Sequence, residues 1–347
     1  MKLSIGVGGY GRSGVAEVVE FVQAADRLGV DSVWSAEAWG HDAVTSLAYL
    51  AGKTERIKIA TGIMQISARV PAMTAMTALS LHAISQGRFI LGLGVSGPQV
   101  VEGLHGSAYD KPLTRLKEHV DICRMAFAGE KLRYDGKTQV LPRPGGEGKA
   151  IRLDHRPADI PIFLATLSPK ALEYTGEAAD GWLGTSFSPE HSGAHLAHVA
   201  RGAAKAGRTL ADIELHAAVT VGIDDDVQAL VDGRKPGVAF AMGAMGSAQT
   251  NFYNAAFARA GYADDAKAIQ DLWIQGKHDE AVARVPDAMV TEFQALGTRD
   301  MVRDRLQKYR EVGISTLNLR LDTVRGQSAR IKLLEEIVDL VSDMESD

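Results

Sequence analysis

Residues 15–36 read VAEVVEFVQAADRLGVDSVWSA, which is a stripe of apolar residues, a glycine and a short apolar run in direct succession. The stripe from Val15 to Leu28 has helical spacing and predicts an amphipathic helix. Gly29 stands where helices commonly end with a left-handed residue. The run at 31–36 is typical of a buried strand. The stretch therefore predicts one helix–strand unit of an α/β fold.

The same order of elements recurs along the whole chain. Strands are predicted at 2–8, 31–36, 57–62, 89–95, 160–165, 181–186, 213–222 and 314–321. Further helices are predicted at 71–85, 113–128, 169–178, 190–205, 299–311 and 328–343. Strands that alternate with helices imply a parallel sheet. Eight such units predict a (β/α)8 TIM barrel with its active site at the carboxyl ends of the strands.

Two segments depart from this repeat. Residues 129–159 are rich in glycine, proline and charge, which predicts a long loop with a small hairpin. Residues 224–298 contain several helical pieces and no clear strand. We therefore expect residues 1–347 to form a single barrel domain. The segment 224–298 is then a helical insertion between the seventh and eighth strands, lying over the barrel mouth.

Composition excludes several classes of protein. The chain has 347 residues, of which 46% are hydrophobic and 23% charged, so a disordered or collagen-like chain is excluded. The net charge is -5, whereas a nucleic-acid binder typically carries an excess of basic residues, so this class is not expected. No apolar stretch reaches the roughly 18 residues of a membrane span, and no signal peptide precedes the first strand, which predicts a cytoplasmic protein with no membrane partner. The single Cys123 excludes an intrachain disulfide, and its helical neighbours predict that it is buried.

Two matches to the pattern G-x-G-x-x-G occur, at residues 6–11 and 92–97. This pattern binds dinucleotides when it joins a strand to a helix and an acid follows. Here Gly11 lies in the loop before the helix, Glu37 lies 26 residues further on, and the second match runs into Pro98 without an immediate helix. A nicotinamide dehydrogenase is therefore a weaker alternative. In a barrel, such glycines let the backbone approach a flat ligand.

Two features lie where a barrel places its chemistry. Glu37 ends the second strand and is a candidate catalytic carboxylate, with a structural ion pair as the alternative. Ser168 and Pro169 start a helix directly after the strand at 160–165. The free N–H groups of its first turn predict a phosphate site, to which Thr185 could add a hydroxyl; the alternative is an ordinary helix cap.

Three histidines stand at helical spacing, namely His191, His195 and His198. This spacing can bind a metal ion, but no acid or cysteine is placed to complete a ligand set. We therefore expect a solvated helix face and no metal site.

Several segments are together similar to one family. They are Gly29–Trp34 leading to Glu37-Ala38-Trp39, Ile59–Ile63 followed by Arg69 and Pro71, Gln86–Phe89 leading to Gly92–Pro98, Ala179–Trp182, Asn251–Asn254, and Leu272 to Gly276. Their order and spacing resemble the luciferase-like monooxygenase superfamily over nearly the whole chain. Within it, the chain looks like the coenzyme F420-dependent oxidoreductases that are related to methylenetetrahydromethanopterin reductase.

The resemblance implies a cofactor site, and the family is usually dimeric, so we expect a homodimer. A non-prolyl cis peptide in a bulge of strand three would support the deazaflavin ring, and by position it would join Gly62 to Ile63. Gln65 would lie along the ring edge. Val95 and Ser96 fall where relatives hold the cofactor. The residues that fall where relatives bind its phosphate are Leu167, Ser168, Lys170 and Ala171.

The chain also departs from part of this family. Sugar-phosphate dehydrogenases of the branch carry a histidine where this chain has Ala38 and a glutamate where it has Gly97. Their substrate-phosphate lysine falls near Ser188. We therefore do not assign the acid and base residues of those dehydrogenases to this chain.

The function that we predict is an F420-dependent oxidoreductase. It transfers a hydride between the cofactor and an unidentified small organic substrate. Glu37 would handle a proton or hydrogen-bond the cofactor ring. One alternative is a two-component monooxygenase that uses reduced FMN, and another is a non-catalytic deazaflavin-binding protein.

Overall fold

The computed structural model describes residues 1–8, 14–246 and 249–346. Eight parallel strands close into a barrel in the order β1, β2, β3, β5, β8, β9, β10, β12, and β12 pairs back to β1. The barrel strands are β1 Lys2–Val7, β2 Ser32–Ser35, β3 Lys58–Thr61, β5 Phe89–Gly94, β8 Ile162–Leu164, β9 Gly181–Gly184, β10 Glu214–Ile223 and β12 Thr316–Arg320. Each predicted strand overlaps one of them, with β10 running one residue past its predicted end, so the TIM barrel is confirmed.

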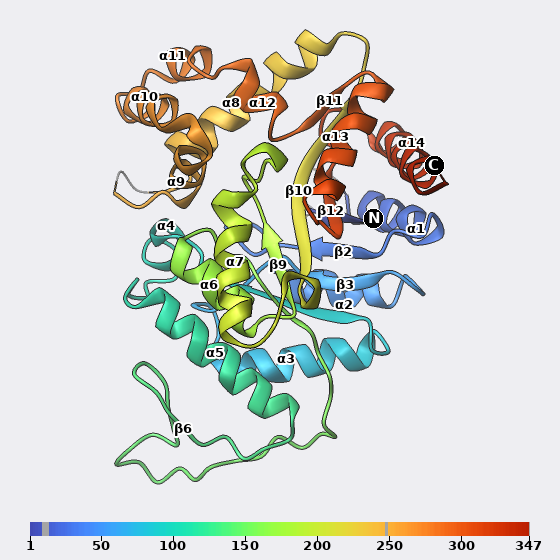
Figure 1. The fold of residues 1–347 in the computed structure, drawn as a ribbon. Coiled ribbons are helices and arrows are strands. Elements are labelled where there is room, and N and C mark those ends of the chain that lie inside the picture. The colour runs from blue at the N-terminus through green and yellow to red at the C-terminus, as the bar shows by residue number, and fades with distance from the viewer. Residues whose placement is uncertain (9–13, 247–248, 347) are drawn as a thin grey trace.

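Helices surround this barrel (Figure 1). Those of the barrel repeat are α1 Val15–Arg27, α2 Ala43–Ala51, α3 Pro71–Ile84, α4 Pro98–Val101, α5 Pro112–Phe127, α6 Pro169–Ala178, α7 Gly193–Lys205, α13 Arg299–Glu311 and α14 Gln327–Ser346. Gly29 has a φ of +80° directly after α1, as its position at the end of the helix predicts. No helix in the described ranges is long and apolar enough to cross a membrane.

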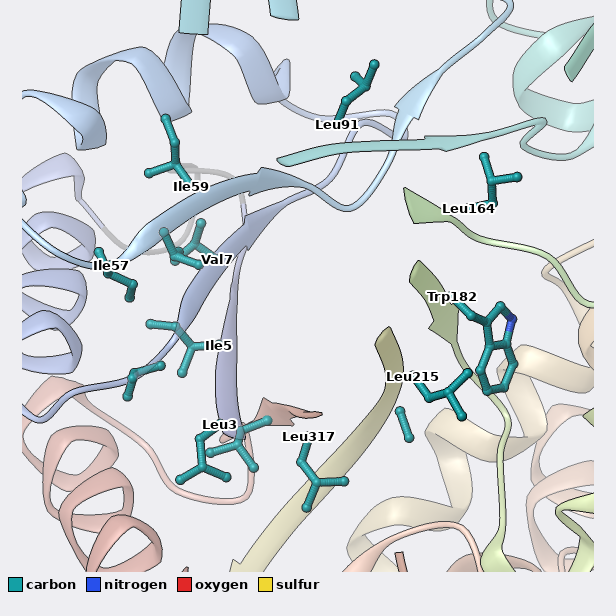
Figure 2. Packing of buried hydrophobic residues seen from close by; sticks show 14 of the residues in the cluster. Leu3, Ile5, Val7, Ile57, Ile59, Leu91, Leu164, Trp182, Leu215 and Leu317 are labelled. Atoms are coloured by element: carbon teal, nitrogen blue, oxygen red, sulfur yellow. The ribbon is translucent and has the colours of Figure 1, made fainter. Parts of the chain in front are cut away.

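The main hydrophobic core lies between the barrel and its helices. Side chains alternate along each strand, so Leu3, Ile5 and Val7 all leave β1 on the side of the helices (Figure 2). Cys123 of α5 belongs to this core and is fully buried, as predicted. Burial raises the pKa of its thiol to about 12, which keeps the thiol protonated and unreactive at neutral pH.

The barrel interior is filled mainly by aromatic rings. Trp34 of β2 lies 5.7 Å from Phe163 of β8 and 5.3 Å from His216 of β10, measured between ring centroids. Phe163 and His216 meet edge to face at 5.2 Å. The Trp34 indole N–H donates to Ser32 Oγ at 3.0 Å, so its polar atom is satisfied inside the barrel. The rings of Trp34, Phe163 and His216 fill the barrel below the carboxyl ends of the strands, and we call this group the aromatic floor.

Residues 224–298 follow β10 and contain helices with a hydrophobic cluster of their own. These elements are α8 Val227–Gly243, α9 Phe252–Phe257, the π-helix Ala258–Tyr262, α10 Ala263–Ile274, α11 His278–Ala283, α12 Asp287–Thr291 and β11 Ala295–Gly297. Figure 1 shows α8 to α12 gathered into a lobe beyond the tips of β9 and β10. The lobe contacts a loop at the carboxyl end of a barrel strand, because Arg259 donates to the Leu167 carbonyl at 2.7 Å.

The second departing segment, residues 129–159, joins α5 to β8. It contains the antiparallel pair β6 Tyr134–Asp135 and β7 Val140–Leu141. Glu118 of α5 anchors this segment by accepting three backbone N–H groups, from residues 137–139, at 2.6 to 2.9 Å. Burial raises the pKa of Glu118, but the Thr138 hydroxyl, which also donates to its carboxylate, and these N–H groups together hold that pKa below its usual value.

The structure differs from the sequence-based expectations in three short elements. Segment 224–298 was expected to hold no strand, yet β11 extends the sheet beside Val221–Ile223 of β10. The second glycine pattern was expected to lack a following helix, yet Gly97 is the N-cap of the short helix α4. Strand β4 at Met64–Gln65 lies beyond the strand predicted at 57–62 and has no counterpart among the predicted strands. Elements of two to four residues are too short to show a period, so tertiary pairing decides them.

Candidate active site

The path of the chain between β3 and β5 contains an extra residue. Ala60 pairs with Ile90, and Met64 pairs with Leu93, so four residue steps on one strand face three on the other. This is a β-bulge, a feature common beside active sites. The Gly62–Ile63 peptide inside the bulge is cis, at the position that the resemblance implied. Thr61 Oγ1 donates to the Gly92 carbonyl and accepts a hydrogen bond from the Gly92 N–H, both at 2.9 Å. These two side-chain bonds replace the backbone hydrogen bonds between the strands that the bulge interrupts.

The bulge lies directly on the aromatic floor. A Cβ at Gly62 would come within 3.2 Å of Trp34 Cε3, so a glycine permits the close approach. A Cβ at Gly94 would come within 2.7 Å of the Ile63 Cδ1 methyl, so the missing side chain there leaves room for Ile63. Gly62 and Ile63 are partly exposed, whereas Met64 and Gln65 are buried. The bulge thus presents the backbone of Gly62 and the apolar Ile63 at the barrel mouth.

Glu37 lies two residues beyond β2, and Arg69 binds its carboxylate. The Arg69 guanidinium donates to both oxygens, at 2.7 and 2.8 Å. The backbone N–H groups of Ala43 and Gln65 add longer contacts of 3.3 Å each. The side chain of Glu37 is 8% exposed and that of Arg69 is 19% exposed. The ion pair considered as the alternative is therefore present, and both carboxylate oxygens are engaged in it.

Gln65 connects this ion pair to the bulge. Its Nε2 donates to the Glu37 carbonyl at 3.0 Å, and the Glu37 N–H donates to the Ile63 carbonyl at 3.0 Å. The side chain is 1% exposed, yet its Oε1 accepts no hydrogen bond from the residues that the structure describes. A buried acceptor without a donor is costly, and such groups often mark a ligand contact. This oxygen is therefore available to accept from a bound molecule.

Val95 and Ser96 follow β5 at the same end of the barrel. Ser96 has a φ of +59°, which is strained for a residue with a side chain. The Tyr109 hydroxyl donates to the Ser96 carbonyl at 3.3 Å and helps to hold that conformation. Burial raises the pKa of Tyr109 to about 12, so its proton stays available for this bond. Val95 and Arg69 also line a pocket of about 250 Å³.

The loop from β8 to α6 presents unpaired backbone donors. Ser168 is the N-cap of α6 and Pro169 its first residue, as predicted, but the Ser168 side chain caps no N–H group. The backbone N–H groups of Lys170 and Ala171 donate to no other described residue. Leu167, Ser168 and Ala171 are partly exposed, and Lys170 is exposed. The first turn of α6 therefore offers donors and a positive dipole end to an anion.

Thr185 follows β9 and is partly exposed, so its hydroxyl lies at the same end of the barrel. The next residue, Ser186, has a φ of +51°. Strained residues thus follow both β5 and β9. Such strain persists only where the surroundings enforce it, and it clusters at functional sites.

The predicted site residues come from neighbouring strands. Glu37 follows β2, residues 62–65 connect β3 to β4, Val95 and Ser96 follow β5, residues 167–171 follow β8, and Thr185 follows β9. Carboxyl ends of parallel strands meet at one end of a barrel, so these residues border one mouth.

Two charged residues near this site were not among the sequence-based candidates. Arg69 belongs to a motif of the family resemblance, but its spacing from Glu37 gives no sign of the ion pair. Arg259 lies in the insertion, and its guanidinium reaches the Leu167 carbonyl of the anion-binding loop. In the sequence, only its position shortly after the Asn251–Asn254 motif could have indicated a role for Arg259.

The histidine triplet does not form a metal site. His191 lies before α7 and contacts Glu292 at 3.1 Å, and His198 contacts Arg201. The expectation of a solvated face is wrong for His195, which is 1% exposed and packs against Trp182 and Phe187. In the described part of the chain, no group of three or more histidine, cysteine or acidic side chains could hold a metal ion.

Comparison with known proteins relates this geometry to a family. The family model for luciferase-like monooxygenases matches residues 3–316. A putative coenzyme F420-dependent oxidoreductase from Mycobacterium tuberculosis is 39% identical over 326 residues, covering 91% of this chain and 94% of that protein. The 5,10-methylenetetrahydromethanopterin reductase of Methanolobus tindarius is 30% identical, covering 93% of this chain and 96% of the reductase.

Solved structures show the same fold. The coenzyme F420-dependent tetrahydromethanopterin reductase of Methanopyrus kandleri superimposes with a TM-score of 0.80 at 21% identity. The match covers 96% of this chain and 97% of the reductase chain. At this level of identity the likeness concerns the fold, and it includes the insertion as well as the barrel.

Proposed function

The chain belongs to the luciferase-like monooxygenase family, and on that premise we propose that it is an F420-dependent oxidoreductase. It transfers a hydride between the deazaflavin and a small organic substrate. The observation that carries the proposal is the bulge between β3 and β4, where Gly62 and Ile63 are partly exposed and the buried Oε1 of Gln65 has no partner among the described residues. The relatives that cover nearly the whole chain carry names with the same cofactor or reductase chemistry.

The residues present fit this cofactor. A flat ring needs a backbone platform without large side chains, and Gly62 over Trp34 supplies one. The pyrimidine part of a flavin-type ring carries an N–H donor, which the buried Gln65 Oε1 can accept. A phosphate needs unpaired N–H donors, which the first turn of α6 supplies at Lys170 and Ala171. When bound, the deazaflavin supplies the hydride chemistry.

The protein's own residues then position the ring and exclude water. Glu37 acts as a positioning residue, because its backbone holds both Ile63 and Gln65 while its carboxylate fixes Arg69. Its further role as a proton carrier stays a prediction, and it requires Arg69 to release one oxygen. Val95, Ser96 and Thr185 border the other sides of the mouth, where their partly exposed atoms can contact the cofactor.

A turnover assay tests the proposal. The purified protein is mixed anaerobically with reduced F420 and a panel of ketones, aldehydes and activated alkenes, and the return of the oxidised deazaflavin absorbance is followed. We expect at least one carbonyl or alkene to accelerate this return above the rate without protein. Oxygen uptake with reduced FMN, together with no oxidation of reduced F420, would replace the proposal by a two-component monooxygenase. Tight F420 binding without turnover across the panel would favour a carrier protein.

A further inference from the structure

A large cavity lies beside the proposed cofactor site. Its volume is about 1,140 Å³, and its walls come from the carboxyl ends of β1 and β2, the segment after β12, and helices α1, α2 and α14. Ala36 and Ala38 line it, and they flank Glu37, whose N–H donates to Ile63 of the bulge. The cavity therefore adjoins the place where the deazaflavin ring is proposed to lie. A volume of this order accommodates a drug-sized molecule.

One wall of this cavity is apolar. Val7, Val18, Phe21 and Trp39 all line it; the first three are at most 8% exposed, so Trp39 carries most of its accessible apolar surface. The Trp39 side chain is 64% exposed, although large aromatic side chains normally bury most of their surface. An exposed ring at the edge of a cavity is available to cover an apolar part of a ligand.

The wall formed by the segment after β12 and the start of α14 carries two arginines. Arg325 and Arg330 both line it, and neither guanidinium group has a hydrogen bond or ion pair with another described residue. Arg330 lies over the Phe21 ring at 4.6 Å, and its Nε is buried without an acceptor. Gln327 Nε2, between the two arginines in the sequence, is likewise a buried donor without an acceptor. Three side chains thus present donors for which no described residue supplies an acceptor.

Acidic side chains do not neutralise this wall. Asp322 lines the cavity but is bound by Arg234 of the insertion, at 2.9 Å. Glu17 is the other acid in the lining and makes no ion pair with a described residue. Among the described residues, two guanidinium groups and one carboxylate of this lining are therefore without an ion-pair partner. Guanidinium groups bind carboxylates and phosphates through parallel hydrogen bonds, which are stronger than bonds between neutral groups.

We infer that this cavity is the substrate site and that it takes an amphipathic anion. The anionic head group, a carboxylate or phosphate, binds Arg325, Gln327 and Arg330, and the apolar body lies against Trp39. The inference rests on the proposed function for the reaction, because hydride transfer requires the substrate to lie next to the cofactor ring. The binding site itself stands on the cavity and its unpaired donors.

Binding can be measured without cofactor or turnover, because Trp39 is a reporter inside the cavity. Decanoate and the uncharged decanol are titrated separately below their aggregation limits, and tryptophan fluorescence is followed. We expect saturable binding of decanoate at least about tenfold tighter than that of decanol. The Trp39→Phe variant should lose most of the signal. The double variant Arg325→Gln/Arg330→Gln should weaken decanoate binding at least about tenfold and leave decanol binding unchanged.

Two further variants keep the test decisive. Arg325→Gln alone changes an exposed side chain and should weaken decanoate binding about threefold even if the double variant folds poorly. Arg143→Gln, an exposed arginine of the 129–159 segment, is the matched control and should change nothing. Equal affinity for decanoate and decanol overturns the inference. A loss of F420 affinity in the double variant as large as its loss of decanoate affinity also overturns it, because the arginines then bind the cofactor.

Failure of the proposed function gives a different pattern. In that case the wild-type protein does not bind F420, whatever decanoate does. If F420 binds and decanoate does not, the cofactor proposal stands and the substrate site lies elsewhere.

Discussion

Removal of one partner from the Glu37–Arg69 pair should destabilise the fold far more than an ion pair at the surface would. The two side chains are 8% and 19% exposed, and two nitrogen–oxygen distances of 2.7 and 2.8 Å join them. Breaking a buried pair by removing one partner typically costs about 3–5 kcal/mol, because a charge is left without compensation. For Glu37→Gln we expect the lower end, about 3 kcal/mol, because water still reaches the Arg69 guanidinium.

Arg69→Met should cost slightly more, about 4 kcal/mol, because Glu37 is the more buried partner and keeps only two N–H contacts of 3.3 Å. The double variant should lose less than the sum of the two single losses, since neither charge is then left alone. We expect a coupling energy of about 2 kcal/mol or more.

Urea unfolding followed by tryptophan fluorescence measures these losses, and variants are compared at equal slope. The exposed pair Arg115–Asp110, with side chains 39% and 51% exposed, is the matched control and should show less than about 1 kcal/mol of coupling. A coupling between Glu37 and Arg69 below about 0.5 kcal/mol would refute the reasoning. The pair would then not hold the bulge, and the carboxylate would be free for other chemistry.

Three further predictions concern packing, pH and the cofactor. Gly92→Ala should lower the free energy of unfolding by at least about 3 kcal/mol, because the added Cβ would lie 1.8 Å from the Thr61 carbonyl oxygen. A loss below about 1 kcal/mol in urea unfolding would contradict this close packing. Burial lowers the pKa of His119 and of His195 to about 4, so the unfolded chain takes up protons between about pH 6.5 and 4 that the folded chain does not. The free energy of unfolding should therefore be highest above pH 6.5 and fall below that pH by up to about 1.4 kcal/mol per pH unit for each histidine. In urea unfolding series from pH 7 to 4, His119→Gln should reduce this slope, and an unchanged slope would contradict the prediction. Gln65→Leu should weaken F420 binding about tenfold, as loss of one buried hydrogen bond would, and fluorescence titration with unchanged affinity would remove Gln65 from the site.

The barrel could be predicted from the sequence because its signals are local and repeated. The spacing from Val15 to Leu28, the glycine after it and the apolar run at 31–36 each depend on a few neighbouring residues. The bulge could not be derived from periodicity, because one extra residue between Ala60 and Met64 changes only the pairing with β5. It was expected from the family resemblance instead.

The site could be predicted only in part, for a related reason. A helix that starts at Ser168 after a strand is a local signal, and the structure shows that start. The Arg69 partner of Glu37 lies 32 residues away, and Arg259 lies 92 residues from the Leu167 carbonyl that it binds. Contacts over such separations depend on how elements pack. The burial of His195 was missed for the same reason, because Trp182 and Phe187 cover it from other elements.

Cofactor binding tests the central claim most directly. The purified protein is titrated with oxidised coenzyme F420 and, separately, with FMN at fixed salt, and cofactor fluorescence is followed in each case. The structure and the family together predict saturable F420 binding at micromolar concentration or below, and FMN binding at least about a hundredfold weaker. Saturable FMN binding without F420 binding would contradict the claim and direct attention to oxygen chemistry.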